Sequence, residues 1–268
     1  MKTALFTTAT LVLLILACAG IVAPGQSFTA TPPLTITVMA AASLSESFQE
    51  LGRQFEAQHP GVRVEFNFAG SHQLAQQLAQ GAPADVFASA NQDQMDSAVR
   101  AVRVAGSSVH IFAHNQLAVI YPSNNPADLV ELHDLGRPGL KLVIAAQEVP
   151  AGHYSLEMLE KASQDPSFSP LFKEAVLQNV VSYENNVKSV LAKVALGEAD
   201  AGIVYTSDVN DQVGQIAIPE ALNVTAAYPI AAIQDSAHAD LAGAFVELVL
   251  SSAGQNVLQK YGFIPVTP

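Results

Sequence analysis

Strand-like and helix-like segments alternate along the chain from Leu34 onward, and this alternation constrains the fold more than any other feature. The first unit is a strand at Leu34–Val38, an Ala-Ala-Ser turn, and a helix at Leu44–Gln58 whose apolar residues recur with a helical period. Regular alternation is typical of α/β proteins, in which helices cover both faces of mostly parallel sheets. The sequence therefore predicts an α/β fold.

The same patterns place the remaining elements. Further strands are predicted at Val62–Phe68, Asp85–Ala90, Val109–Phe112, Gln116–Tyr121, Leu140–Ala145, Val180–Tyr183, Ala201–Tyr205 and Ala226–Ile233. Further helices are predicted at His72–Gln80, Asn91–Val99, His153–Lys161, Phe168–Gln178, Val187–Leu196, Leu241–Ser251 and Ala253–Lys260, with a short helix or turn at Pro126–Asp134.

Four of the strands end in a turn of small or polar residues that leads into a helix. Ser43 and Ser71 occupy the first two turns, Ala151 and Gly152 the third, and Glu184-Asn185-Asn186 is the predicted cap of the fourth helix. Ser43 is expected to cap its helix through its side-chain oxygen. Free N–H groups at a helix start, together with the helix dipole, favour anions. In open α/β sheets ligands bind outside the carboxyl ends of the strands, so the four turns are candidates for one binding site.

The charge balance of the chain restricts what it binds. Among 268 residues there are 12 basic and 24 acidic residues, for a formal net charge of −12, and no basic run occurs. A nucleic-acid partner or an anionic membrane surface is therefore not expected. An anion would have to be held by local dipoles and hydrogen bonds. The length suffices for one large domain or two modest lobes.

The N-terminus has the pattern of an export signal. Lys2 precedes an apolar run, Leu11–Ala17, that is too short to span a membrane. The run ends at Cys18, the only cysteine, in a segment that resembles a lipobox. We predict a signal peptide at residues 1–18, lipidation of Cys18, and a flexible tether at 19–33. Ordinary cleavage between positions 20 and 30 is the alternative, and in both cases the protein is exported.

Catalytic patterns are absent from the sequence. It has no glycine-rich phosphate loop, no G-x-S-x-G elbow, no H-E-x-x-H motif and no second cysteine for a metal cluster. His110 and His114 lie in a predicted strand and turn, where a spacing of four does not place both rings on one face. His72 and His153 follow two of the turns and are expected to be solvated. The sequence therefore predicts a binding protein and not an enzyme.

Several segments together resemble the periplasmic molybdate-binding protein of bacterial molybdate ABC transporters. The resemblance covers Leu34 to Phe263 and is carried by Val38–Leu44, Gly70-Ser71, Gly81–Ala90, Val149–Tyr154, Gly202–Asp208 and Tyr261–Phe263. It implies a type II periplasmic binding protein fold of two lobes, each a mixed, mostly parallel sheet flanked by helices, with the ligand in the cleft between them. By this resemblance, lobe 1 comprises residues 34–115 plus 229–268 and lobe 2 comprises 116–228, with hinge strands near Gln116–Tyr121 and Ala227–Ile233.

The resemblance also implies a set of oxyanion-binding residues. The hydroxyls of Ser43 and Ser71 would bind from one lobe, and the backbone N–H groups of Ala151 and Val187 with the hydroxyl of Tyr205 from the other. The metal of molybdate or tungstate would be contacted only through its oxygens, and no cofactor is implied. The expected partners are the ion, an ABC transporter permease and, through lipidated Cys18, the membrane; such receptors are usually monomers.

The sequence departs from the family pattern at two positions and leaves some alternatives open. Gly70 stands where a second Ser often precedes the binding Ser, and Thr206 where Gly often follows the Tyr. The ligand could be another oxyanion such as sulfate or phosphate, or Glu148 or Glu184 could join the coordination of the metal. A secreted hydrolase would use Ser43 or Ser71 with His72 or His153. The sequence does not separate molybdate from tungstate.

Overall fold

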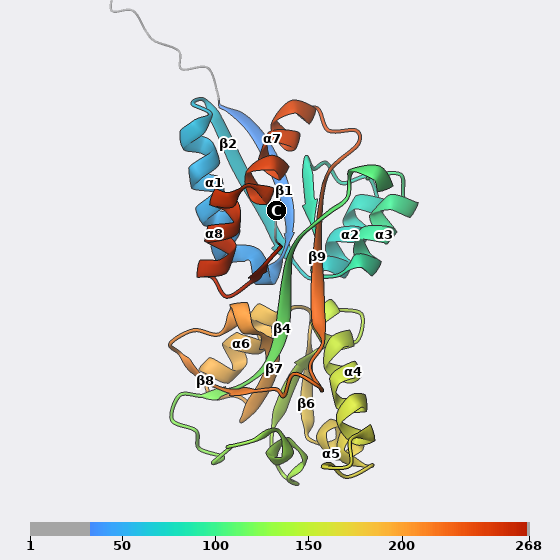
Figure 1. Cartoon of the computed structure of the whole chain (residues 1–268), viewed down its shortest axis with the longest axis vertical. Helices are drawn as coiled ribbons and strands as arrows, with labels where there is room; N and C mark the ends of the chain where they lie inside the picture. The colour runs from blue at the N-terminus through green and yellow to red at the C-terminus, as the bar shows by residue number, and fades with distance from the viewer. Residues whose placement is uncertain (1–32, 267–268) are drawn as a thin grey trace, which may run out of the picture. The chain divides into compact units, whose positions relative to one another are not determined.

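Ten strands form one sheet that brings distant parts of the chain side by side (Figure 1). The structure is a computed structural model, and it describes residues 33–266. Its strands are β1 (Leu34–Ala41), β2 (Val62–Ala69), β3 (Val86–Ala88), β4 (His110–Pro122), β5 (Leu142–Ala145), β6 (Val180–Glu184), β7 (Ala201–Tyr205), β8 (Val213–Ala217), β9 (Thr225–Ala232) and β10 (Ile264–Pro265). Their order is β2-β1-β3-β9-β4-β7-β5-β6, and β8 and β10 pair with β4.

Helices connect most of these strands, as the alternation predicted. They are α1 (Ser45–Gln58), α2 (Ser71–Ala79), α3 (Gln92–Arg100), α4 (Pro150–Gln164), α5 (Phe172–Gln178), α6 (Val187–Ala195), α7 (Ala239–Leu250) and α8 (Ser252–Lys260), with 3₁₀ helices η1 (Ala42–Leu44), η2 (Gly106–Ser108), η3 (Leu132–Gly136) and η4 (Thr206–Asp208). The α/β class is confirmed. Some details differ from the prediction. The two strands expected between residues 109 and 121 are the single strand β4, β8 and β10 were not predicted, and α4 and α5 begin at other residues than predicted.

Strand β4 is shared by two parts of the sheet. The first part contains β2, β1, β3, β9 and β10, in which β1 is parallel to both β2 and β3 while β9 is antiparallel to β3. The second part contains β7, β5, β6 and β8, in which β5 is parallel to β6 and β7. Along β4, residues up to Gln116 pair with β9, and residues from Leu117 pair with β7 and β8. The parallel strands of each part therefore direct their carboxyl ends, and the turns that follow them, to one edge.

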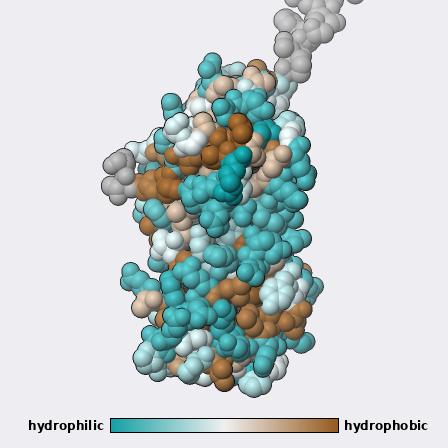
Figure 2. All heavy atoms as spheres, turned by 90° about the vertical axis from the view of Figure 1, so that its right-hand side faces the viewer, coloured by the Kyte–Doolittle hydropathy of each residue, from teal (hydrophilic) through white to brown (hydrophobic). Residues whose placement is uncertain are grey.

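The strand β1 shows how the core of the first part is filled. Ile36 and Val38 belong to a cluster that includes Phe48 of α1 and Phe245 of α7, whereas Met39 packs with residues of α2 and α3 on the other face. Figure 1 shows α1, α7 and α8 on one side of this part and α2 and α3 on the other. Burial on both faces explains why β1 is almost continuously apolar. The outer face that carries α3 and α4 is mostly hydrophilic, with some apolar areas (Figure 2).

Some predictions concern features that the structure does not test. The described residues form one compact unit by contacts, and the lobe boundaries 34–115 plus 229–268 and 116–228 stay a prediction. The signal peptide, the tether to residue 32 and Cys18 lie outside the described residues. Within the described part, no single helix is long and apolar enough to span a membrane. Helices α7 and α8 reach that length and composition only as a pair bent by 62°, and they bury Phe245, Val249 and Leu258 in the core.

Candidate functional site

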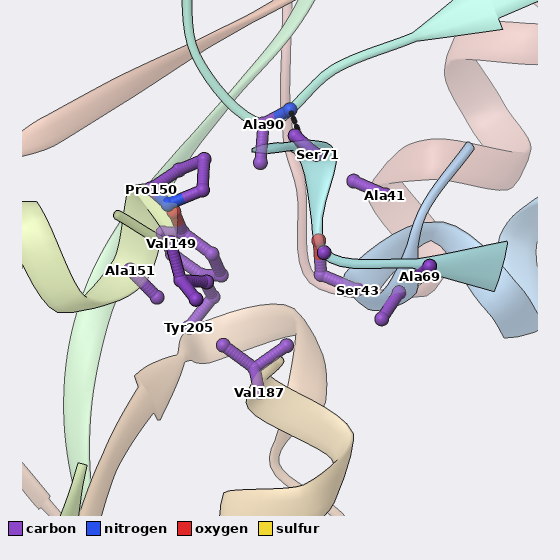
Figure 3. Close-up of a pocket in the computed structure, with 12 residues that line it drawn as sticks. Ala41, Ser43, Ala69, Ser71, Ala90, Val149, Pro150, Ala151, Val187 and Tyr205 are labelled. Carbon is purple, nitrogen blue, oxygen red and sulfur yellow. Dashed lines mark hydrogen bonds between the residues drawn. The ribbon is translucent and has the colours of Figure 1, made fainter. Parts of the chain in front are cut away.

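Four helix starts converge on one small pocket, which contains all five of the predicted binding residues. The pocket has an empty volume of about 210 Å³ including its open mouth. It is lined by Ala41, Ala42, Ser43, Ala69, Gly70, Ser71, Ala90, Val149, Pro150, Ala151, Val187 and Tyr205 (Figure 3). The residues before position 100 form what we call the first wall, and those after it form the second wall.

Ser43 lies in the first wall, but it does not cap a helix as predicted. The chain leaves β1 through the 3₁₀ helix η1, so Ser43 lies inside a helical turn and α1 begins only at Ser45. No side-chain cap is present at the start of either helix. Instead the Oγ of Ser43 is 2.9 Å from the Oη of Tyr228, and the residue is 3 % exposed. The prediction of a cap was wrong because the inserted turn directs the hydroxyl toward the pocket.

Ser71, the other hydroxyl of the first wall, is the first residue of α2. Its Oγ accepts a hydrogen bond of 3.0 Å from the backbone N–H of Ala90. A hydroxyl that accepts from a backbone N–H keeps its own proton for another acceptor. Gly70 precedes it, and a Cβ there would overlap the carbonyl oxygen of Asn185, which follows β6 in the second part of the sheet. The first wall therefore lies close to the backbone that precedes α6 at Gly70.

The second wall is built mainly from backbone at the starts of α4 and α6. Helix α4 begins at Pro150, three residues before the predicted start, so Ala151 lies in its first turn, where N–H groups have no partner within the helix. A Cβ at Gly152 would overlap the carbonyl oxygens of Ala145 and Ala146, so the glycine lets α4 start directly on the end of β5.

Val187 is the first residue of α6, as predicted. The side chain of Asn186 caps this helix by accepting a 3.0 Å bond from the N–H of Ser189, which confirms the predicted cap. The cap satisfies a donor one turn further on and leaves the N–H of Val187 directed out of the helix start. Both second-wall helices therefore present N–H groups and the positive end of a helix dipole to the pocket.

Tyr205, the last residue of β7, supplies the only aromatic side chain that lines the pocket. It is 1 % exposed, and its hydroxyl has no hydrogen-bond partner among residues 33–266. Burial raises the pKa of Tyr205 well above 10, and the nearby Tyr228 adds to the shift. The phenol therefore stays protonated and neutral at physiological pH. A buried polar group without a partner is destabilising, so this hydroxyl is suited to a ligand that accepts a hydrogen bond.

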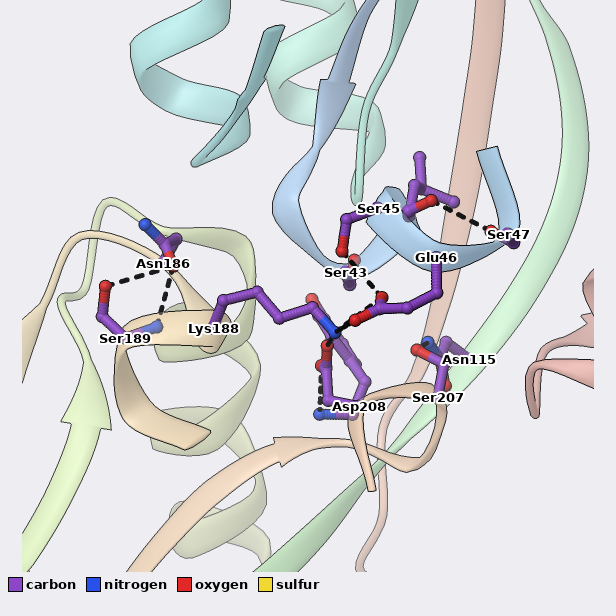
Figure 4. A network of polar contacts seen from close by, with 12 residues as sticks. Ser43, Ser45, Glu46, Ser47, Asn115, Asn186, Lys188, Ser189, Ser207 and Asp208 are labelled. Atoms are coloured by element: carbon purple, nitrogen blue, oxygen red, sulfur yellow. Dashed lines mark hydrogen bonds and ion pairs between the residues drawn. The ribbon is translucent and has the colours of Figure 1, made fainter. Parts of the chain in front are cut away.

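Charged side chains lie beside the pocket, where one ammonium is paired with two carboxylates. The ammonium of Lys188 is 2.8 Å from the carboxylate of Glu46 and 3.1 Å from that of Asp208 (Figure 4). Burial alone would lower the pKa of Lys188, but the two carboxylates outweigh it and raise that pKa. Burial raises the pKa of Asp208, and Lys188 opposes the shift. Since Glu46 belongs to the first part of the sheet and the other two to the second, the cluster links the walls without adding charge to the pocket lining.

The other candidate residues do not line the pocket. Glu184 bonds to Lys193 and Ser182, and Glu148 is exposed. His153 is also exposed, while burial lowers the pKa of His72 and Glu148 opposes that shift. No group of three metal-binding side chains is found within residues 33–266.

Two buried residues near the pocket were missed from the sequence. Tyr228 of β9 contacts Ser43, and Asn115 of β4 contacts Tyr228. Neither lies in a turn, and no local motif marks them, because the contacts join positions more than 100 residues apart.

Comparisons with known proteins show which sequences and structures this chain is similar to. Residues 36–264 match the family model of bacterial extracellular solute-binding proteins. A molybdate-binding protein ModA of Mycobacterium tuberculosis is 40 % identical over 255 residues, covering 91 % of this chain and 93 % of the relative. The substrate-binding domain of a putative molybdenum ABC transporter from Clostridium difficile is 29 % identical, with a TM-score of 0.64 over 87 % of this chain and all of the other. The periplasmic molybdate-binding protein of Azotobacter vinelandii, 20 % identical, shares the fold with a TM-score of 0.74 over 87 % and 99 % of the two chains.

Proposed function

The chain belongs to the family of bacterial extracellular solute-binding proteins, and we propose that it captures molybdate or tungstate and delivers the ion to an ABC importer. The proposed ligands are the hydroxyls of Ser43, Ser71 and Tyr205 and the backbone N–H groups of Ala151 and Val187. The observation that carries the proposal is the buried hydroxyl of Tyr205, which has no partner among the described residues and lines a pocket without charged side chains. The 40 % sequence identity between this chain and a molybdate-binding protein supports the choice of ion.

Neutral donors are sufficient to hold a tetrahedral dianion in such a pocket. Each hydrogen bond to a charged group contributes roughly 1.5–3 kcal/mol, and each helix start adds the equivalent of about half a positive charge. Five donors converging from two walls would surround the ion on several sides. Because every one of them donates, an ion that carries a proton would bring an O–H group without a dedicated acceptor.

The size of the ion is the expected basis of selectivity. Donors fixed at the distances suited to molybdate would not all reach the smaller sulfate ion, so some would stay unpaired. Molybdate and tungstate are nearly equal in size and charge, and we expect the pocket to bind both.

The proposed function also involves the two lobes and the N-terminus of the protein. The two lobes, 34–115 plus 229–268 and 116–228, would close over the ion and present the closed surface to a permease. The metal would be contacted only through its oxygens, as cargo, with no resident cofactor and no catalytic turnover. The protein would be exported as a monomer and anchored through a lipid on Cys18, which lies outside the described residues.

The test is calorimetric titration of the purified protein with molybdate, tungstate, sulfate and phosphate at one pH and salt concentration. We expect one-to-one binding of the first two and no heat from the others. Ser43→Ala should weaken binding, whereas Ser47→Ala is the matched control, since Ser47 is equally buried but bonds the carbonyl of Leu44 outside the pocket. Silence with all four ions would contradict the proposal. Ester hydrolysis lost in Ser43→Ala would favour the hydrolase instead.

A further inference from the structure

A chain of buried hydrogen bonds runs from β4 to the hydroxyl of Ser43. The side-chain nitrogen of Asn115 is 2.8 Å from the Oγ of Ser207 and 3.5 Å from the Oη of Tyr228. The Oη of Tyr228 is in turn 2.9 Å from the Oγ of Ser43. The bonds that Tyr228 makes with Asn115 and Ser43 are buried, so water does not compete for them. Figure 4 shows Asn115 and Ser207 facing each other near Ser43.

The orientation of the Asn115 amide fixes the direction of the first bonds. Its Oδ1 accepts from the backbone N–H of Gln116 at 3.0 Å and from the hydroxyl of Thr206 at 2.9 Å. A backbone N–H can only donate, so the oxygen of the amide must lie on that side and the NH₂ group on the other. The NH₂ group has no free lone pair, and it therefore donates toward Ser207 and Tyr228.

The direction of the next bond follows from the first. Two side-chain atoms of the described residues lie within hydrogen-bonding distance of the Tyr228 hydroxyl: the Nδ2 of Asn115, which can only donate, and the Oγ of Ser43. Of these two, only the Oγ of Ser43 can accept the phenol proton. Burial raises the pKa of Tyr228 well above 10, so this proton is present throughout the physiological range. Ser43 then accepts from Tyr228 and keeps its own proton for the pocket that it lines.

We infer that Asn115 and Tyr228 are positioning residues that fix the hydroxyl of Ser43 as a donor toward the bound oxyanion. The inference rests on the proposed function. The Oγ of Ser71 is oriented in the same sense, but by the backbone N–H of Ala90. Both hydroxyls of the first wall are therefore oriented as donors toward the pocket. A backbone N–H orients Ser71, and the side chains of Asn115 and Tyr228 orient Ser43.

Removal of the phenol oxygen should weaken binding by a moderate factor. Without the bond from Tyr228, the O–H of Ser43 would be free to occupy about three staggered orientations, and only one of them faces the ion. This freedom alone predicts that the affinity for the ion falls roughly threefold. The connected hydrogen bonds also polarise the O–H of Ser43, and without that polarisation the affinity should fall by at most about tenfold.

The experiment is a double-mutant cycle measured by molybdate titration. Tyr228→Phe keeps the ring, which packs against Phe112, Tyr205 and Phe263. We expect it to weaken binding roughly three- to tenfold in the wild-type background and to have no effect in the Ser43→Ala background. An equal loss in both backgrounds, or no loss in either, would overturn the inference. Tyr261→Phe is the control, because that hydroxyl bonds Glu50 outside the pocket.

A second variant tests the direction of the hydrogen bonds from Asn115 through Tyr228 to Ser43. Asn115→Asp keeps the shape of the side chain but replaces the NH₂ donor by an acceptor, so Tyr228 would turn its proton away from Ser43. The added charge would repel the ion in either background, whereas the effect on Ser43 would vanish in Ser43→Ala. We therefore expect Asn115→Asp to weaken binding more in the wild-type background, and equal losses would contradict the polarity.

A measurement without ligand separates this inference from the proposed function. In NMR spectra of the ion-free protein we expect a slowly exchanging tyrosine hydroxyl proton that shows a nuclear Overhauser contact to the β-protons of Ser43 and disappears in Tyr228→Phe. A wild-type protein that binds none of the four ions but shows this proton would refute the proposed function and leave the orientation of Ser43 established. A proton that belongs to Ser43 and faces Tyr228 would refute the inference itself.

Discussion

The two walls of the pocket offer hydrogen bonds in different ways. The first wall presents the side-chain hydroxyls of Ser43 and Ser71, and each oxygen is within hydrogen-bonding distance of a buried donor, Tyr228 or the Ala90 N–H. The second wall presents backbone N–H groups at the starts of α4 and α6, together with the hydroxyl of Tyr205, which has no partner within residues 33–266.

The two walls therefore respond differently to substitution. A side-chain donor is removed by one substitution, so the first wall depends directly on residue identity. A backbone donor survives most substitutions and is lost only when the start of the helix moves. A Cβ at Gly152 would overlap the carbonyl oxygens of Ala145 and Ala146 and so would force the start of α4 to move. Tyr205 is the exception in the second wall, since it is the only side-chain donor there.

Loss of the ion pairs of Lys188, which link the two parts of the sheet, should have the largest effect on stability. Lys188→Met leaves Asp208, whose side chain is fully buried, without its counter-charge, and loss of one partner of a buried pair costs about 3 kcal/mol or more. We expect a decrease of about 3 kcal/mol in the free energy of unfolding at pH 8, measured by urea denaturation. Because burial raises the pKa of Asp208 above its unfolded value, the folded variant takes up a proton first as the pH falls, and the decrease should shrink toward pH 5.

The double variant Lys188→Met with Asp208→Asn provides the control for that result. It removes the buried charge together with its partner, and we expect it to recover much of the lost stability at pH 8. A single variant that is equally destabilised at pH 8 and pH 5 would show that the ionised Asp208 is not the cause.

The close approach of the walls at Gly70 should give the next effect. Gly70→Ala places a Cβ on the carbonyl oxygen of Asn185, and relief requires the walls to separate. Overpacking of this kind costs about 1–3 kcal/mol, so molybdate affinity should fall by roughly tenfold to a hundredfold, measured by calorimetry. Gly243→Ala is the matched control, since a Cβ at that helical position meets nothing within 4 Å. Equal affinity in Gly70→Ala would show that the walls do not need this approach.

The side-chain donor of the second wall should have an effect on binding of similar size. Tyr205→Phe is expected to weaken molybdate binding by about 1–3 kcal/mol. The ion-free protein should lose no stability, because the hydroxyl has no partner to lose among the described residues. Paired titration and thermal unfolding check the two expectations, and a variant with lowered unfolding temperature but unchanged affinity would assign Tyr205 a purely structural role.

The acidic residues near the second wall should give the smallest effect. Glu148→Gln and Glu184→Gln are expected to change molybdate affinity by less than about twofold, since neither side chain lines the pocket and Glu184 is held by Lys193. A large loss in either variant, measured in the same titration, would support the alternative in which a carboxylate joins the metal.

The features that local sequence determines were predictable. Hydrophobic period and turn residues gave the alternation of strands and helices, and the strand β7 was placed at residues 201–205 as observed. The cap at Asn186 was also predicted, because it involves only the N–H of Ser189, three residues further along the chain. The sets of small residues at the ends of parallel strands indicated the four turns that the pocket brings together.

Features that depend on distant contacts were not predictable. Strand β8 is stabilised by its pairing with β4, and the role of Ser43 depends on Tyr228, 185 residues away. A cap at Ser43 was the natural reading of a strand, a serine and a helix in succession. The inserted turn η1 changed the direction of the hydroxyl, and nothing in the local pattern distinguishes the two outcomes.

The absence of basic side chains from the pocket lining has a consequence for the speed of capture. A chain with a formal net charge of −12 repels an anion at long range, so diffusion toward the pocket is opposed and not steered. Added salt screens this repulsion at distances beyond the Debye length, which is about 10 Å at 0.1 M. Association should therefore accelerate as ionic strength rises, the reverse of receptors that attract anions with arginine or lysine, while dissociation, which is governed by short hydrogen bonds, should change little.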